Sequence, residues 1–380
     1  MELSTEDSLR LHVLLTNVYA IRIDAEAMEV RGLSLDGGTV REARVTLAPN
    51  CRRTQYVRYV REFISGVVLG SPGGYPLHLA RWTRMGQRRD EGLDKLLLLG
   101  EPEAVTAVAG APGLTDELAR RVWWIAPTSE HARRMLEREP VRSGTMGPVL
   151  AMHLVEHLPF ETDARVVMET VRLILQPGLI TEGARRRLWE TGAKQSAYCV
   201  GFLQAMPENL PEPLPARADL DDYEQMLAVL ADAGNPVAIL ALRALRAPGQ
   251  TFIEAASRVL RRPMDQDVIA VALDTIGSYF RCVGPQRVAG RDVQVIEREA
   301  LAACVEGSSV HGSQAARAVL REAPALAAEL SALLTLGAIT ESVVTDILAH
   351  TTATGTLLQK KLAPVTEVIL KQLTALAQAS

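Results

Sequence analysis

Short turns that contain proline or glycine interrupt the middle of this 380-residue chain at close intervals. The stretches between them are rich in Ala, Leu, Arg and Glu, which favour helix, and aromatic residues make up only 4% of the chain. Because a short helix cannot hold its apolar face out of water alone, neighbouring helices must pack on one another. The sequence therefore predicts a mainly α fold, either a helical-repeat (HEAT-like) array or an α-bundle. The turns are Gly100-Glu101-Pro102, Ala111-Pro112-Gly113, Ala126-Pro127, Leu158-Pro159 and Gln176-Pro177-Gly178.

One segment of the chain occurs twice. Residues 112–124 resemble residues 177–189, with Pro, Gly, Leu, Glu, Ala, two Arg and Trp at equivalent places 65 residues apart. In each copy, Pro-Gly is typical of the end of one helix, and Thr followed by Glu is typical of the start of the next. The spacing favours two stacked helical hairpins, and chance recurrence of one well-capped helix start is the alternative.

The first 50 residues follow a different pattern. Residues 21–24, 28–31 and 43–47 alternate apolar and polar side chains, and Asp36-Gly37-Gly38 is a turn signal. This pattern predicts a small antiparallel β element. Three short strands are not stable in water by themselves, so we expect them to pack on the helices that follow.

These patterns predict four segments, namely an N-terminal mixed β/α segment (1–92), a helical-repeat domain (93–206), a Pro-rich linker (207–219) and a C-terminal helical domain (220–380). The linker contains four prolines, which remove backbone donors and favour extended chain. A helix is also predicted over about 54–66. The helices expected in the last domain cover residues 221–233, 235–247, 251–262, 265–281, 291–306, 311–322, 325–337, 340–351 and 356–378.

Charge and hydropathy limit the class of partner and the compartment. The net charge of −4 argues against broad binding of nucleic acid or anionic membranes by the whole molecule, although it leaves room for a local basic patch. No apolar run reaches transmembrane length, and the acidic start of the chain is unlike a secretory leader. We therefore expect a cytoplasmic protein without membrane insertion. The four cysteines are too widely spaced for a zinc knuckle and are expected to be reduced thiols.

The most specific chemical motif is His153-Leu154-Val155-Glu156-His157. It matches the H-x-x-E-H pattern of inverted zinc metallopeptidases. On a helix, His153 and His157 would share a face and bind one Zn²⁺, with Glu156 as general base. A catalytic zinc needs a third protein ligand, and the sequence points to none. A zinc-dependent hydrolase is therefore an alternative function, and two histidines on an ordinary helix face are the other interpretation.

A basic stretch with interleaved aromatic residues runs from Arg52 to Arg89. Arginine can neutralise phosphates and aromatic rings can stack on bases, so an RNA-binding regulator is a second alternative. Acidic residues follow directly at 90, 91 and 94 and favour pairing within the chain, so nucleic acid is not the partner that we expect. The residues concerned are Arg52, Arg53, Tyr56, Arg58, Tyr59, Arg61, Arg81, Trp82, Arg84, Arg88 and Arg89.

Several stretches of the first 200 residues resemble the DsrS family of sulfur-metabolism proteins, and the remainder is similar more loosely. The resemblance implies an accessory or regulatory role beside the reverse dissimilatory sulfite reductase system, with which sulfur-oxidising bacteria oxidise stored sulfur in the cytoplasm. It brings no catalytic residue and no cofactor with it. The stretches that carry it are residues 4–11, 69–76, 81–87, 97–105 and 112–121.

The leading hypothesis is a non-catalytic helical scaffold that binds a protein of the sulfur-oxidation machinery and holds no cofactor. The sequence contains no recognisable catalytic set. Its two repeated arginine pairs, Arg120-Arg121 and Arg185-Arg186, are the candidate partner-binding residues.

Overall fold

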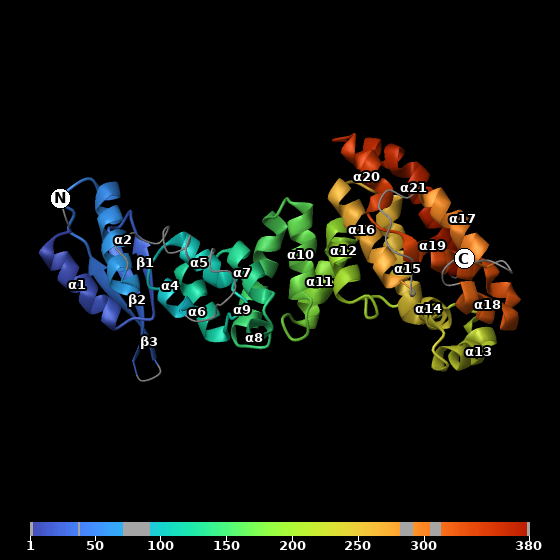
Figure 1. The fold of residues 1–380 in the computed structure, drawn as a ribbon, viewed down its shortest axis with the longest axis horizontal. Coiled ribbons are helices and arrows are strands. Elements are labelled where there is room, and N and C mark those ends of the chain that lie inside the picture. The colour runs from blue at the N-terminus through green and yellow to red at the C-terminus, as the bar shows by residue number, and fades with distance from the viewer. Residues whose placement is uncertain (1–2, 37–38, 71–91, 282–291, 305–312, 378–380) are drawn as a thin grey trace. The chain divides into compact units, whose positions relative to one another are not determined.

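The computed structural model describes residues 3–36, 39–70, 92–281, 292–304 and 313–377. It is mainly helical, with a small three-stranded antiparallel sheet near the N-terminus, and this confirms the predicted fold class (Figure 1). The chain divides into two compact units, which are described separately below. Unit 1 comprises Met1–Pro159 with Pro177–Ile180, and unit 2 comprises Phe160–Gln176 with Thr181–Ser380. The predicted linker at 207–219 lies inside unit 2, away from this boundary.

The sheet of unit 1 forms where the alternating pattern predicts it. Its strands are β1 (Ala20–Asp24), β2 (Glu29–Asp36) and β3 (Thr39–Thr46), in the order β1-β2-β3. In the register, Ile23 pairs with Val30, and Val30 pairs with Val45. Val30 is fully buried and belongs to the same buried cluster as Ile21, on the face of the sheet that the helices cover.

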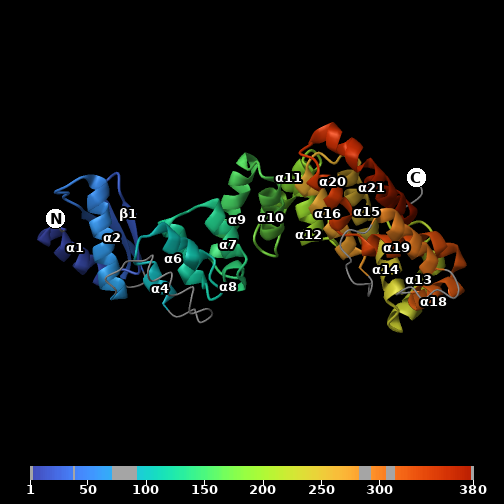
Figure 2. The same ribbon diagram turned by 45° about the horizontal axis from the view of Figure 1, so that its top comes forward.

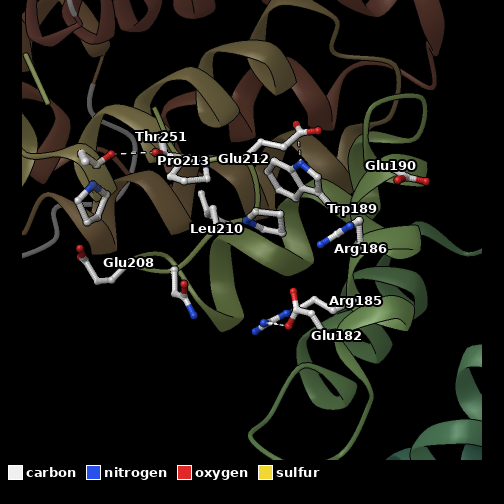
Figure 3. A pocket seen from close by; sticks show the side chains of 14 residues that line it. Glu182, Arg185, Arg186, Trp189, Glu190, Glu208, Leu210, Glu212, Pro213 and Thr251 are labelled. Atoms are coloured by element: carbon white, nitrogen blue, oxygen red, sulfur yellow. Dashed lines mark hydrogen bonds and ion pairs between the residues drawn. The ribbon is translucent and has the colours of Figure 1, made fainter. Parts of the chain in front are cut away.

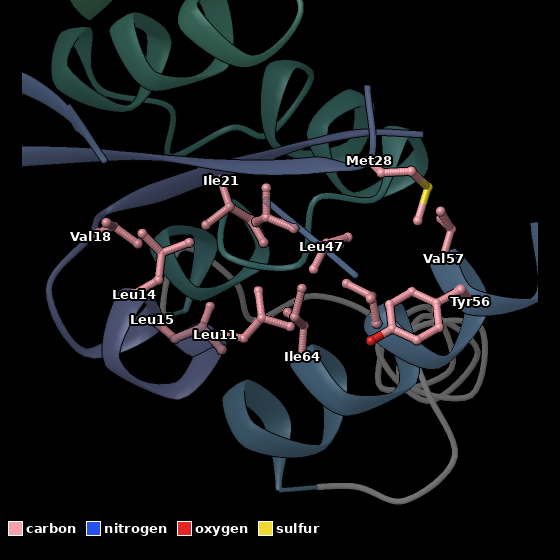
Figure 4. Close-up of a cluster of buried hydrophobic side chains, with 12 residues drawn as sticks. Leu11, Leu14, Leu15, Val18, Ile21, Met28, Leu47, Tyr56, Val57 and Ile64 are labelled. Atoms are coloured by element: carbon pink, nitrogen blue, oxygen red, sulfur yellow. The ribbon is translucent and has the colours of Figure 1, made fainter. Parts of the chain in front are cut away.

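Two helices cover that face of the sheet, α1 (Thr5–Thr16) and α2 (Arg53–Leu69). The sequence predicts α2 but not α1. The missed signals are Ser4, whose hydroxyl accepts the N–H of Asp7 at 3.1 Å, and apolar residues at helical spacing. Figure 4 shows how the two helices and the sheet enclose one cluster of side chains. Its members include Leu11, Leu14, Leu15, Val18, Ile21, Met28, Leu47, Tyr56, Val57 and Ile64.

A buried polar contact joins α1 to α2 inside this core. The carboxylate of Asp7, which is 1% exposed, accepts a short hydrogen bond from the Tyr56 hydroxyl. The same oxygen accepts the N–H of Ala48 at 3.0 Å, just after β3. Burial, then the hydrogen bond to Asp7, raises the pKa of the Tyr56 phenol, so this group remains a donor. The contact fixes how the two helices and the end of the sheet meet.

The rest of unit 1 is a series of short helices that pack on their neighbours, as the turn signals predict. Pairs in contact include α5 with α6, α6 with α7, and α7 with α9. The elements are α4 (Leu93–Leu96), α5 (Pro102–Ala109), α6 (Asp116–Ile125), α7 (Ser129–Leu136), α8 (Glu139–Arg142), α9 (Met146–His157) and the 3₁₀ turn Leu158–Phe160 at the border.

Unit 2 is a bundle of longer helices, in which α15, α16, α19 and α21 lie side by side (Figures 1 and 2). Their starts and ends follow the predicted positions to within a few residues. The helices are α10 (Ala164–Ile174), α11 (Glu182–Gly192), α12 (Ser196–Ala205), α13 (Leu220–Asp232), α14 (Pro236–Leu245), α15 (Ala247–Arg261), α16 (Gln266–Tyr279), α17 (Val293–Ala303), α18 (Ser313–Glu322), the 3₁₀ turn Pro324–Leu326, α19 (Ala327–Ala338), α20 (Ser342–Ala349) and α21 (Gly355–Leu376).

No single helix within the described ranges is long and apolar enough to cross a membrane. Residues 324–338 and 342–349 reach that length and hydropathy only as a pair, with a bend of 56° between them. Leu330, Leu333 and Leu336 of the first helix are buried in unit 2.

Gly277 should be irreplaceable in unit 2. A Cβ atom at this position would lie 1.9 Å from the carbonyl oxygen of Ile339, and a main-chain atom cannot move aside as a side chain can. We expect Gly277→Ala to lower the free energy of unfolding by about 2 kcal/mol or more, because it overpacks a rigid contact. Gly183→Ala is the matched control, since its nearest neighbour would be the end of the Arg187 side chain at 3.9 Å. In urea denaturation the control should be neutral or more stable by up to about 1 kcal/mol. Equal effects of the two variants would contradict the contact.

The Tyr56 hydroxyl should stabilise unit 1. Tyr56→Phe removes the donor and leaves the Asp7 carboxylate buried with the Ala48 N–H alone. We expect a loss of about 1–3 kcal/mol in thermal or chemical unfolding, because the desolvation of the carboxylate is then poorly compensated. Tyr59→Phe is the control, since the Tyr59 hydroxyl accepts an exposed hydrogen bond from the Gln55 side chain. A loss in Tyr56→Phe no larger than in the control would refute this role.

Candidate partner-binding groove

Unit 2 contains a groove with a volume of about 570 Å³. Three parts of the chain form it: α11, the Pro-rich segment (residues 207–215) and the start of α15 (Figure 3). Arg185 and Arg186, which the sequence predicts to bind a partner, are among its lining residues. The other residues that line it are Glu182, Trp189, Glu190, Glu208, Asn209, Leu210, Pro211, Glu212, Pro213, Ala247, Pro248 and Thr251.

Helix α11 turns its charged side chains toward the groove because its apolar side chains point inward. The hydroxyl of Thr181 accepts the N–H of Ala184 at 3.3 Å and so caps the helix. Ala184, Leu188 and Trp189 are buried, and they leave positions 182, 186 and 190 exposed. This outer face presents alternating acidic and basic groups.

Trp189 anchors α11 to the wall of the groove. Its ring is 4% exposed and packs edge-on against Phe202, with ring centroids 5.1 Å apart. The guanidinium of Arg258 lies 5.1 Å from the ring centroid. The indole N–H donates to Glu212 of the Pro-rich segment at 3.0 Å. A buried indole with its donor satisfied holds the helix and the segment together.

The Pro-rich segment is packed against the bundle along its length. Leu210 is buried, and the N–H of Leu214 donates to the hydroxyl of Thr251 at 3.0 Å. Farther along, the N–H of Arg217 donates to the carbonyl of Leu245 at 2.8 Å. Contacts with α14 and α15 therefore hold this segment in place, although it is not paired as a strand. It forms a wall of the groove rather than a flexible linker.

Glu212 adopts a backbone conformation that L-residues rarely use. Its φ is +59°, although prolines stand on both sides of it. Such a conformation costs roughly 1–3 kcal/mol and persists only where the surroundings enforce it, most often at functional sites. Here the hydrogen bond from Trp189 is one contact that holds it.

The charges around the groove are unequally paired. Arg185 forms an ion pair with Glu182 within α11, and Arg243 forms one with Glu208. Arg186 has no ion pair with any residue in the described part of the chain, although Glu190 lies one helical turn away from it. An exposed guanidinium at the edge of a groove can donate two parallel hydrogen bonds to a carboxylate.

The other predicted pair, Arg120 and Arg121, lies on α6 in unit 1 and is engaged within that unit. Arg120 donates to the hydroxyl of Thr145 at 3.2 Å. Arg121 lies 3.2 Å from a Glu117 oxygen and stacks over Tyr19, 5.0 Å from its ring centroid. Of the two pairs, Arg185 and Arg186 are the ones that line the groove.

The two copies of the repeated segment both begin a helix, as predicted, but out of register. Thr115 caps α6 and Thr181 caps α11, 66 residues later, whereas the matching letters recur after 65. The matching tryptophans also differ in burial. Trp189 is buried, while Trp124 is partly exposed and its indole N–H donates to Glu42 at 2.9 Å. A helical repeat beyond these two helix starts stays a prediction.

The H-x-x-E-H motif lies on α9, and the imidazoles of His153 and His157 stack with centroids 3.9 Å apart. His153 Nε2 lies 3.2 Å from the Ser129 hydroxyl, and His157 Nδ1 lies 2.8 Å from the His153 carbonyl. Within the described ranges, no group of three or more His, Cys, Asp or Glu side chains is arranged to hold a metal ion. A zinc-dependent hydrolase through His153, Glu156 and His157 therefore stays a prediction that lacks a third ligand.

Part of the predicted RNA-binding stretch lies outside the described residues, namely Arg81, Trp82, Arg84, Arg88 and Arg89. In the described part, most of the residues are engaged within the chain. Arg58 pairs with Glu62 at 2.9 Å, and Arg61 lies 3.6 Å from Glu101. Arg53 donates to the carbonyl of Glu26 at 3.4 Å. Tyr56 is fully buried in the core of unit 1, so it cannot stack on a base.

No protein-family model matches this sequence, no curated protein is similar to it, and no solved structure matches it. The resemblance to the DsrS family accordingly stays a prediction.

The environment of His153 predicts a pH dependence of the stability of unit 1. Burial, then the neighbouring His157, lowers the pKa of His153 below its usual range. The folded state therefore prefers the neutral imidazole, and this contribution is complete above the unfolded pKa of about 6.5. It is lost as the pH falls from there through the lower folded pKa. An NMR titration of the imidazole signals should give His153 a pKa below 6.5, and His153→Gln should flatten the fall in stability between about pH 7 and pH 5. A pKa at or above 6.5 would contradict this.

Proposed function

We propose that this chain is a non-catalytic helical scaffold, and that its groove on unit 2 binds an acidic segment of a partner protein. One observation carries the proposal. An open groove of about 570 Å³ is bordered by Arg186, an exposed guanidinium without an ion pair among the described residues. Grooves of this size accept peptide side chains, and arginine is the cation best suited to a carboxylate at an interface.

The walls of the groove favour a peptide over a small polar molecule. Pro211 and Pro213 present a rigid surface, because proline has little backbone freedom left to lose on binding. Leu210 and Trp189 support that surface from beneath. A rigid wall beside a charged helix face is typical of surfaces that recognise extended segments.

The charge pattern specifies the partner segment further. Glu182, Glu208 and Glu212 each have a partner in the chain, so they are already neutralised or hydrogen-bonded. Arg186 and Glu190 remain on neighbouring turns of α11. A segment that carries a carboxylate with a cation close by would complement both groups.

The resemblance to the DsrS family supports the identity of the partner as a protein of cytoplasmic sulfur oxidation. In that role the scaffold would hold or regulate an enzyme of the pathway and would need no cofactor of its own. This part of the proposal depends on the resemblance alone, whereas the groove and its charges support partner binding independently of it.

Photo-crosslinking from within the groove tests the proposal. A photoreactive phenylalanine analogue at the exposed Asn209 should crosslink a partner in cells grown on reduced sulfur. Arg186→Glu in the same chain should lower the yield at least tenfold, because it replaces an attraction for the partner's carboxylate with a repulsion. Arg187→Glu is the matched control, since Arg187 is exposed on the same helix but does not line the groove.

The outcomes separate the two parts of the proposal. Equal yields from Arg186→Glu and Arg187→Glu would refute the groove as the binding site. A partner that depends on Arg186 but has no part in sulfur oxidation would support the groove and refute the pathway.

A further inference from the structure

A second surface of unit 2 lies where α15 ends and α21 begins. Two hydrogen bonds hold these segments side by side: the N–H of Gly355 donates to the carbonyl of Met264 at 3.0 Å, and Gln359 donates to the carbonyl of Arg261 at 3.2 Å. The two neighbouring segments carry four exposed cations and two exposed apolar side chains, a set that we call the basic platform. It consists of Arg261, Arg262, Met264, Leu357, Lys360 and Lys361.

The apolar residues of the basic platform protrude. Met264 is 58% exposed and Leu357 is 57% exposed, although each stands beside buried residues of the bundle. Two leucines of α21 that follow Leu357, at positions 358 and 362, are fully buried and fix the orientation of the helix. The packing of α21 therefore directs Leu357 outward, and the exposure of this side chain is not caused by fraying of the helix end.

Cations outnumber carboxylates at this surface. All four cations are exposed. Glu254 pairs with Arg261 at 3.4 Å, and the carboxylate of Asp265 accepts the N–H groups of Asp267 and Val268 at the start of α16. Three cations thus have no ion pair among the described residues, at 262, 360 and 361. In a chain of net charge −4, this is a local concentration of positive charge.

The basic platform is ordered before any partner binds. The side-chain amide of Gln266 donates to the carbonyls of Thr351 and Ala353, both at 3.0 Å. The ammonium of Lys361 donates to the Thr351 hydroxyl at 2.8 Å. These contacts connect the start of α16, the segment before α21 and α21 itself, so binding need not first order a loop.

We propose that the basic platform docks the protein on an anionic phospholipid surface. Phosphate headgroups would neutralise the cations, and Met264 and Leu357 would enter the boundary between headgroups and acyl chains. Two protruding apolar side chains among cations fit a bilayer better than an acidic peptide, which needs enclosing pockets for its anchors. The six residues include no aromatic side chain on which a nucleic-acid base could stack. Docking of this kind is peripheral and does not rest on the groove.

Vesicle sedimentation of the full-length protein tests the proposal. We expect binding to vesicles of phosphatidylcholine with 30% phosphatidylglycerol, weaker binding as salt rises, and little binding to phosphatidylcholine alone. Arg262→Gln with Lys360→Gln should lower the partition coefficient about 25-fold, at roughly fivefold per charge. Met264→Ser with Leu357→Ser should also weaken binding, with every charge retained.

Arg186→Gln with Arg187→Gln is the matched control, because it removes two exposed cations from α11 of the same unit. Loss of binding in this control equal to that in the platform variant would overturn the proposal, as would equal binding to neutral and anionic vesicles. Absence of vesicle binding, together with platform-dependent binding of a glutamate-rich peptide, would overturn it in favour of an acidic protein. None of these results depends on whether Arg186 binds a partner in the groove.

Discussion

Burial of the apolar face of one helix by its neighbours is the interaction on which both units depend. Several of the helices are too short to persist alone in water, such as α5 with 8 residues and α14 with 10. Most residues of α14 are buried, because α13, α15, α18 and α19 surround it. Removing one helix therefore exposes apolar surface on several others, and stability belongs to the stack rather than to any single element.

Much of this architecture could be predicted because its signals are local. Asp265 caps α16 by accepting the N–H groups of residues 267 and 268, and the sequence predicts a helix over about 265–281 where α16 extends from Gln266 to Tyr279. The small sheet likewise follows from alternation and a glycine turn. Helix α1 shows the limit of local signals. Ser4 is a capping residue at its start, but the residues that follow the helix alternate like strands, and the sequence does not predict α1.

The division of the chain could not be predicted from composition. Prolines between 207 and 215 are typical of a linker, because proline stiffens a chain that nothing else holds. In the molecule, the burial of Leu210 and the hydrogen bond from Leu214 to Thr251 fasten the segment to the bundle. Arg186 was predictable as an exposed residue of a capped helix, whereas the groove beside it depends on where this segment packs. Trp189 and Glu212 are 23 residues apart in the sequence, and no local sequence pattern predicts their hydrogen bond.

The short excursion of the chain at Pro177–Ile180 back into unit 1 has a consequence for biosynthesis. Leu179 is buried against Gly147 there, so unit 1 lacks one of its core side chains until that residue has left the ribosome. By then α10, which belongs to unit 2, has already been made. The N-terminal unit therefore cannot complete its folding strictly before the synthesis of the second unit has begun, and a fragment cut after Pro159 would lack a native part of its interior.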